Sequence, residues 1–311
     1  MTPTTGSRSP AGDTYIIATL FCAVSALSGS AYLVIKLAVS DLPPEVVACA
    51  RAALGASVLW PLAYRRGALG GLASRRRQLA ILGCLEFAAP FLLLSVGTQW
   101  IASSLAGVLM AAGPLFVALF AIRFDISEQV TRTQLLGLLV GLLGVVCLLG
   151  ITFNGRAIEI AGAAIVIGAS CSFALGALYL KRHFVGASAL GVVAGAMTCG
   201  CAVLALPAAL ALPDHWPSGP TVLAVGVLGI VHAALNYVLF FALVQRTGAG
   251  RASVTSYVAP AVAVLLGTLI LNEPAGTGLI AGSVLIVVGS WLSTGGALPA
   301  RAPAGIARRP E

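Results

Sequence analysis

The chain has 311 residues, of which 59% are hydrophobic and only 9% are charged, and its mean hydropathy is +1.01. This composition excludes an ordinary soluble domain, in which about 25% of residues are charged, and indicates a polytopic membrane protein. The net charge of +8 does not predict nucleic-acid binding, because the cations stand in short clusters between apolar runs, where membrane topology explains them.

The ends of the chain differ from its middle. Residues 1–14 and 296–311 are rich in Pro, Gly, Ser, Ala and Arg and predict disordered tails. Between the tails lie ten apolar segments, each near the length that a bilayer requires, so we expect an all-α protein with ten transmembrane helices. Their approximate limits are 15–37, 44–64, 79–99, 102–122, 133–151, 158–180, 188–211, 221–244, 250–271 and 276–294.

The positions of Lys and Arg predict the orientation of these segments. With the N-terminus in the cytoplasm, fifteen cations fall on the inner side and Arg156 alone on the outer side, while Lys36 and Arg51 lie in or at the edge of segments. Cytoplasmic loops carry such an excess. We therefore expect a multi-pass protein of the plasma (inner) membrane with both termini cytoplasmic.

The chain also resembles itself at an offset of 145–146 residues, which marks a duplicated unit. The matching pairs are Lys36 with Lys181, Gln99 with Gln245, Gly107 with Ser253, Pro114 with Pro260, and Glu128 with Glu273. Each unit holds five segments, an odd number, so the two copies are expected to be inverted relative to each other. Inverted repeats are common in secondary transporters, whose substrate site lies near mid-membrane between the halves.

Three stretches resemble a known family: SGSAYLVIKLAVSDLPPEVVACARAALG, SSLAGVLMAAGPLFVALFAIRFDISEQVTRTQLLGLLVGLLGVVCLLG and GAGRASVTSYVAPAVAVLLGTLILNEPAGTGLIAGSVLIVVGSWL. They look like the EamA branch of the drug/metabolite transporter superfamily. The resemblance implies two EamA repeats, at 15–151 and 158–295, around a central cavity used in alternating access. Glu128 and Glu273 resemble the acid that usually follows helices four and nine. The first copy, IRFDISE, is one residue longer from proline to acid than the second.

The third segment contains the most unusual pair of residues, in LGCLEFAAPFLLLSVG. Helical periodicity places Glu86 and Pro90 on one face, where Pro90 cannot bond the carbonyl of Glu86. An offset of 146 puts His232 opposite Glu86 and Asn236 opposite Pro90. Polar groups survive at such depth only when they face protein or a watery cavity, so these four residues are the leading candidates for a cavity lining. Glu86 could bind substrate or take up a proton; alternatively it pairs with a cation such as Arg51 and fixes helix packing.

Further candidates lie in neighbouring segments. Arg51 either holds a substrate carboxylate or neutralises Glu86, while Lys36, at the outer edge of the first segment, either contributes to the cavity or extends to the lipid headgroups. Small residues and a proline share one face of segments four and nine, and predict either hinging or close packing. These are Gly107 and Pro114 in the first copy and Ser253 and Pro260 in the second, where Tyr257 adds a hydroxyl for cavity contact.

No sequence motif supports another class of function. We find no nucleophile elbow, zinc-protease signature, Walker loop or repeated filter group, so neither an enzyme, an ATP-driven pump nor a channel is expected. The seven cysteines lie in apolar runs and predict no disulfide or zinc site, and no cofactor is expected. We expect a monomeric or homodimeric secondary transporter that exports a small amino acid-like or drug-like metabolite, with protons as a candidate coupling ion. Uptake of small amines or other metabolites is the alternative, and a membrane-embedded enzyme is a less favoured one.

Overall fold

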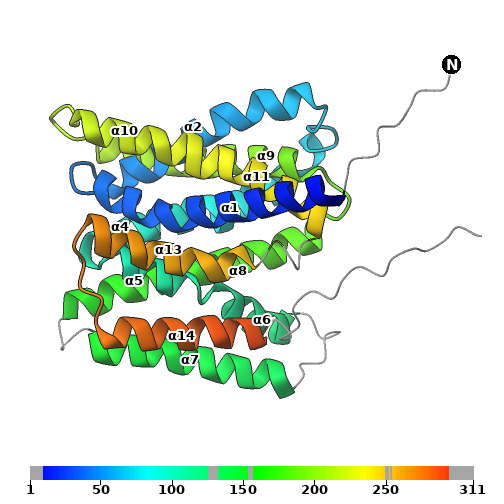
Figure 1. Cartoon of the computed structure of the whole chain (residues 1–311). Coiled ribbons are helices and arrows are strands. Elements are labelled where there is room, and N and C mark those ends of the chain that lie inside the picture. The colour runs from blue at the N-terminus through cyan, green and yellow to red at the C-terminus, as the bar shows by residue number, and fades with distance from the viewer. Residues whose placement is uncertain (1–9, 125–131, 153–156, 249–251, 253, 294–311) are drawn as a thin grey trace, which may run out of the picture.

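The computed structural model describes residues 10–124, 132–152, 157–248, 252 and 254–293, and the described residues form helices and no strand (Figure 1). The first half contains α1 (Pro10–Ala38), α2 (Pro44–Arg65), η1 (Ala73–Arg75), α3 (Arg76–Gly83), η2 (Cys84–Ala88), α4 (Ala89–Trp100), α5 (Ser103–Met110), α6 (Gly113–Phe124) and α7 (Arg132–Thr152). The second half contains α8 (Ala157–His183), α9 (Ala189–Leu210), α10 (Gly219–Val227), η3 (Leu228–Leu235), α11 (Asn236–Thr247), α13 (Thr255–Ile270) and α14 (Thr277–Ser293).

The helices fall where the apolar segments predict them. Seven are long and apolar enough to cross a membrane, some of them built from two or more consecutive elements, and three shorter apolar helices lie within α7, α13 and α14. An all-helical membrane protein is thus confirmed. The predicted tails and the residues Glu128, Arg156, Arg251 and Ser253 lie outside the described part of the chain.

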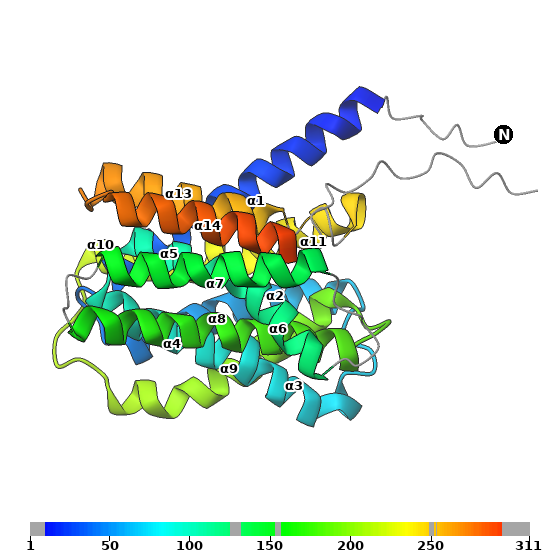
Figure 2. The same cartoon turned by 90° about the horizontal axis from the view of Figure 1, so that it is seen from below.

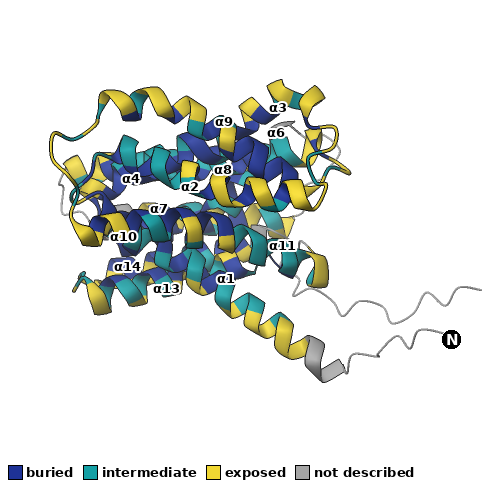
Figure 3. Cartoon of the chain, turned by 90° about the horizontal axis from the view of Figure 1, so that it is seen from above, coloured by how far each residue is buried: buried dark blue, intermediate teal, exposed yellow. Residues whose placement is uncertain are grey.

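The outward faces are those of a protein that meets lipid. Leu136, Leu139, Leu143 and Val146 form an exposed apolar face on α7, because residues spaced by three and four share a helix face. Figure 3 shows such exposed stretches on the outside of the bundle and buried residues where helices meet. An apolar surface of this extent is unfavourable in water and is satisfied in a bilayer.

Equivalent helices of the two halves pack against each other, and a contact made by one half recurs at the equivalent residues with the roles of the halves reversed. Helices α7 and α14 lie side by side (Figures 1 and 2). A Cβ built on Gly144 would lie 2.8 Å from the backbone nitrogen of Ile286, and one on Gly289 would overlap the backbone of Gly141. An offset of 145 turns the first pair into the second. The residue numbers rise in α7 as they fall in α14, so these equivalent helices are antiparallel.

The same exchange recurs elsewhere in the bundle. Gly83 lies against the backbone of Gly200, and Gly229 lies against the side chain of Leu54, two pairs that are related by an offset of 146. In addition, α1 packs on α10, η3, α11 and α13, while α8 packs on η2, α4, α5 and α6. The first helix of each half therefore packs against the third and fourth segments of the other half. The two halves interlock as a pair of inverted units.

Candidate functional site

Two π-helical segments occupy equivalent places in the two halves. In η2 the N–H of Ala89 donates to the carbonyl of Cys84, and in η3 the N–H of Asn236 donates to the carbonyl of Val231, in each case five residues before. Glu86 lies within η2 and His232 within η3. Short π-helical segments inside helices are rare and occur frequently at functional sites. The structure thus places both polar residues at an irregular turn of their segments.

Glu86 lies against the second half of the chain. Its carboxylate is close to Gly176 of α8, where a Cβ would overlap its Oε2. Ser172, one turn earlier in α8, donates from its hydroxyl to the carbonyl of Leu85 at 2.8 Å. We predicted that Pro90 would leave the Glu86 carbonyl free, whereas the carbonyl seen bonded to a side chain belongs to Leu85. The reason is that hydrogen bonds in this turn span five residues, as the bond from the Ala89 N–H to the Cys84 carbonyl does. Pro90 follows Leu85 by five residues and has no N–H to donate to its carbonyl.

Buried Oε2 of Glu86 has no hydrogen-bond partner among the described residues, and neither does Nε of Arg51. The Arg51 guanidinium stands over the ring of Phe91, with Cζ 3.9 Å from the ring centroid. No ion pair joins Glu86 to Arg51 in the described part of the chain. Tyr237 lies within electrostatic range of both. A carboxyl group and a guanidinium thus share one region of the bundle without an ion pair between them.

Aromatic rings surround these charges. Phe87 meets Phe91 edge to face at 5.7 Å between centroids, and it lies 5.7 Å from Tyr237, which in turn is 6.1 Å from Phe241. Tyr32 of α1 is within electrostatic range of Arg51. The sequence prediction missed these aromatic residues, although Phe91 and Tyr237 directly follow Pro90 and Asn236. The site therefore combines an anion, a cation and an apolar aromatic wall.

His232 and Asn236 are held by α1. Nδ1 of His232 lies 3.2 Å from the Val227 carbonyl and Nε2 lies 3.0 Å from the Ser30 hydroxyl. A carbonyl only accepts, so Nδ1 carries a proton, and in the neutral ring Nε2 accepts from Ser30. The amide nitrogen of Asn236 donates to the Ser28 hydroxyl at 3.1 Å, while its buried oxygen has no partner among the described residues. His232 is a satisfied side chain, and Asn236 is satisfied in part.

Lys36 lies away from these groups, at the end of α4. Its ammonium donates to the carbonyls of Thr98 at 2.6 Å and Ile101 at 2.9 Å, with Gln99 at 3.4 Å. A cation beside the last carbonyls of a helix is favourable. The ammonium is thus bound to protein rather than to headgroups.

The predicted hinge residues lie where segment four is interrupted. The fourth segment breaks between Met110 and Gly113. The carbonyl of Met110, four residues before Pro114, accepts a hydrogen bond from the Ser170 hydroxyl at 3.4 Å. A Cβ on Gly107 would overlap that of Ala263 in α13, so close packing is needed there. In the second half, α13 continues through Pro260.

Tyr257 makes a contact within the second half. Its hydroxyl donates to the carbonyl of Ser290 at 3.2 Å, which places the ring between α13 and α14. Ser253, the predicted counterpart of Gly107, lies outside the described residues.

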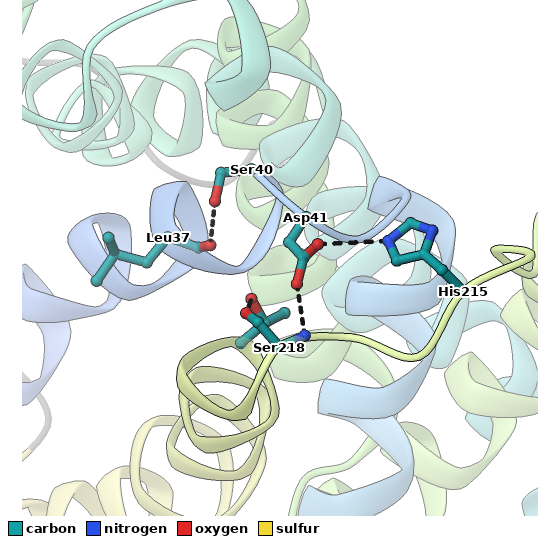
Figure 4. A network of polar contacts seen from close by, with 6 residues as sticks. Leu37, Ser40, Asp41, His215 and Ser218 are labelled. Atoms are coloured by element: carbon teal, nitrogen blue, oxygen red, sulfur yellow. Dashed lines mark hydrogen bonds and ion pairs between the residues drawn. The ribbon is translucent and has the colours of Figure 1, made fainter.

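A further polar contact, absent from the sequence prediction, joins the halves at one end of the bundle (Figure 4). Asp41, in the turn between α1 and α2, accepts from the Ser218 N–H at 2.8 Å, just before α10, and lies 3.4 Å from Nε2 of His215. The hydrogen bonds from the Ser218 backbone, and from the Thr221 and Ser218 hydroxyls, lower the pKa of Asp41 to about 2. Only the structure reveals this contact, because Asp41 and Ser218 are far apart in sequence.

Within the described residues, no group of His, Cys, Asp and Glu side chains could hold a metal ion. The cysteines there are free thiols. The site offers a carboxyl group, a guanidinium and aromatic surface.

Comparison with known proteins places these features in context. The sequence model of a family described as the EamA-like transporter family matches residues 15–150 and 160–295. An uncharacterized transporter of Archaeoglobus fulgidus is 26% identical over 85% of this chain and 93% of its own. The uncharacterized inner membrane transporter YedA of Escherichia coli (strain K12) is 29% identical over 77% of this chain and 78% of its own. A probable amino-acid metabolite efflux pump of Salmonella typhimurium is 27% identical over 86% and 91%. A solved crystal structure shares the fold, with a TM-score of 0.60, 22% identity and coverage of 92% of this chain and 98% of that chain.

Proposed function

The chain belongs to the EamA-like transporter family, and on this premise we propose that it exports small, amino-acid-like zwitterions across the plasma membrane by alternating access. Ten membrane-spanning segments, with both termini in the cytoplasm, form the proposed topology. The antiparallel packing of the equivalent helices α7 and α14 supports alternating access, because inverted units alternate between two symmetry-related states.

The observation that carries the substrate class is the pair of unpartnered charges. A buried charge in a membrane costs several kcal/mol, by the smaller estimates about 2.5–3.5 kcal/mol, and removal of one ion from a buried pair costs about 3–5 kcal/mol. Oε2 of Glu86 and Nε of Arg51 are buried without a hydrogen-bond partner among the described residues. A ligand that carries an ammonium and a carboxylate would neutralise both at once.

The aromatic wall supports an apolar portion of the substrate. Phe87 and Phe91 are buried, and Tyr237 is half-buried beside them. An ammonium bound at Glu86 and a carboxylate bound at Arg51 would leave the rest of the molecule against these rings. We propose Tyr237, which is in range of both charges, as the residue that orients the backbone atoms of the substrate. His232 and Asn236 complete the site from the second repeat.

Export is the proposed direction. One relative is named as a probable amino-acid metabolite efflux pump, and the resemblance to the superfamily favours outward movement of metabolites. Glu86 is the proposed point at which a proton enters when the substrate leaves, which would couple export to the proton gradient. Uptake of small amines is the second candidate, and it requires only Glu86.

Metabolite profiling tests the proposal directly. Spent medium and cell extracts are compared for cells that produce the wild type, Glu86→Gln, Arg51→Gln, Glu45→Gln or no protein. We expect zwitterionic compounds to accumulate in the medium only with the wild type and with Glu45→Gln, a control carboxylate in the first turn of α2. Accumulation inside the cells would support uptake instead. If Glu86→Gln and Arg51→Gln are equally abundant and export as fast as the wild type, the site is wrong.

Proton coupling needs a separate measurement. In vesicles loaded with the identified compound, an imposed proton gradient should accelerate movement through the wild type. The Glu86→Gln variant should retain exchange of labelled for unlabelled compound but lose this acceleration. Acceleration that survives in Glu86→Gln would assign coupling to another group.

A further inference from the structure

The turn between α4 and α5 is held by charged side chains from outside its own segment. Helix α4 ends at Trp100 and α5 begins at Ser103, so the last carbonyls of one helix and the first N–H groups of the next lie side by side. Ala102, the N-cap residue of α5, makes no side-chain hydrogen bond. The turn therefore depends on partners supplied by other elements.

Lys36 of α1 supplies the cation. Its three carbonyl contacts, at Thr98, Gln99 and Ile101, all belong to the C-terminal end of α4 and the turn. A positive charge there complements the helix dipole. This side chain joins the first segment to the third.

Glu273, in the connection between α13 and α14, supplies the anion. Its two carboxylate oxygens accept from the N–H groups of Ser103 at 2.7 Å and Ser104 at 2.9 Å. Charge-assisted bonds of this length are about twice as strong as neutral ones. Burial acts to raise the pKa of Glu273, but the bonds from Ser104 and Ser103 outweigh it and hold the pKa below its usual value.

The chain around Glu273 is shaped for this contact. Asn272 has φ 53°, the only positive φ of a non-glycine residue in the described part of the chain. Asn tolerates this left-handed conformation better than most residues. The Glu273 N–H then bonds the Gly267 carbonyl at 3.1 Å, and a Cβ on Gly267 would overlap the Glu273 carboxylate. The sequence Leu-Asn-Glu thus turns the acid back toward α5.

Building on the proposed transport function, we infer that Lys36 and Glu273 form a latch that closes the outer end of the bundle and opens once in each transport cycle. Glu273 belongs to the second repeat and α5 to the first, so separation of the repeats at this end removes the cap from α5. Lys36 and Glu273 are also in electrostatic range of each other. Breaking the latch therefore shifts the population toward the state that is open to the outside.

Hydrogen–deuterium exchange in lipid nanodiscs tests the latch without any substrate, so its outcome is independent of the proposed export. The variants are Glu273→Gln, Lys36→Met and Gly267→Ala, with Glu45→Gln as control. We expect backbone exchange to rise about fivefold, the effect of about 1 kcal/mol. The rise should extend over the end of α1, the α4–α5 turn and the α13–α14 connection together. Exchange around η1 and the loop after α8, at the opposite end, should fall.

The pattern of exchange separates a latch from a simple cap. A cap alone would raise exchange only at the first turn of α5 and leave the opposite end of the molecule unchanged, and that result would overturn the inference. Unchanged exchange in Glu273→Gln would overturn it as well. If Glu273→Gln fails to fold, Lys36→Met provides the same readout from the α4 side of the turn.

Discussion

At the residue scale, the charged and polar side chains inside the bundle differ in whether the protein itself satisfies them. Lys36 is bonded to three carbonyls, and His232 is bonded at both ring nitrogens. Glu86 and Arg51, by contrast, have buried atoms without partners among the described residues. Because buried polar groups are normally paired, this contrast supports the proposal that Glu86 and Arg51 meet a ligand.

The sequence alone predicts only some of these residues and none of the distances between them. An acid one helical turn before a proline in an apolar run identified Glu86, and the repeat offset led from it to His232 and Asn236. The alternatives for Arg51 stayed open because helix periodicity gives no distance between side chains on different helices. Contacts such as Ser30 with His232 join residues about 200 positions apart, which no local pattern encodes.

Asp41 yields a prediction for pH dependence. Its pKa is about 2 in the folded protein, below the ordinary value of about 3.9. A lowered carboxyl pKa contributes stability that is complete above the ordinary pKa and disappears as the pH falls through the folded-state value. We expect Asp41→Asn to lower Tm slightly at about pH 5 to 8, and this difference from wild type to shrink below about pH 4.

Tryptophan fluorescence during thermal unfolding in detergent measures this difference. Asp214→Asn serves as the control, because Asp214 is an exposed carboxylate in the same loop as His215. A Tm difference between the wild type and Asp41→Asn that stays constant down to pH 3 would contradict the role given to the Ser218 contact.

At the element scale, the candidate residues Glu86 and His232 both lie in π-helical segments. The proline in segment three predicted the loss of one helical hydrogen bond beside η2. The sequence of η3 contains no proline, and its single glycine, Gly229, does not by itself predict π-helical turns. Packing by α1 and the bonds of His232 stabilise η3 instead. In η3 the irregularity is therefore a property of the bundle, whereas in η2 the missing N–H of Pro90 contributes to it.

Replacing Pro90 tests this interpretation. Pro90→Ala supplies an N–H that can restore regular helical bonding and remove the π-helical turn around Glu86. We expect Tm to stay the same or rise, since a proline in a helix interior costs up to about 3 kcal/mol. Export should nevertheless fall about tenfold, the effect of about 1.4 kcal/mol on the barrier.

The matched control for this change is Pro61→Ala, which lies inside α2, a helix without a π-helical segment. It should change stability in the same direction and leave export intact. Transport assays and thermal unfolding measure export and Tm for both variants. Equal export by Pro90→Ala and the wild type would show that the irregular turn is dispensable.

The contact between α7 and α14 allows a second test at this scale. A Cβ at Gly289 would overlap the backbone of Gly141, and a Cβ at Gly144 would crowd Leu285 and Ile286. Since overpacking typically costs about 1–3 kcal/mol, Gly289→Ala and Gly144→Ala should both lower the free energy of unfolding by this amount. Gly226→Ala, where a Cβ meets open space, should be neutral. Chemical denaturation followed by circular dichroism compares the three.

At the scale of the whole molecule, the fold was largely predictable and the interlocking of its halves was not. Segment length and hydropathy located the helices, and the offset of 145–146 residues revealed the duplication. An odd number of segments per repeat implied inversion. The packing of α1 on α13 and of α8 on η2, however, depends on how small residues such as Gly29 and Gly176 let the helices approach, which only a three-dimensional structure shows.

The proposed topology leads to the last prediction. In the proposed topology fifteen cations lie on the cytoplasmic side and Arg156 lies on the other side, and such a bias controls insertion when the loops are short. Alkaline phosphatase fused within residues 211–218 should be active outside the cytoplasm, and green fluorescent protein fused after residue 293 should fluoresce inside.

Removal of a cluster of cations provides the control for this topology. Substitution of Arg75, Arg76 and Arg77 by Gln should reduce the fraction of molecules with the 211–218 loop outside, because these residues hold one turn in the cytoplasm. A C-terminal reporter found outside would require an odd number of spans. Since α7 and α14 are antiparallel and equivalent, an odd total would leave one repeat without its inverted partner, and the alternating mechanism would lose its structural basis.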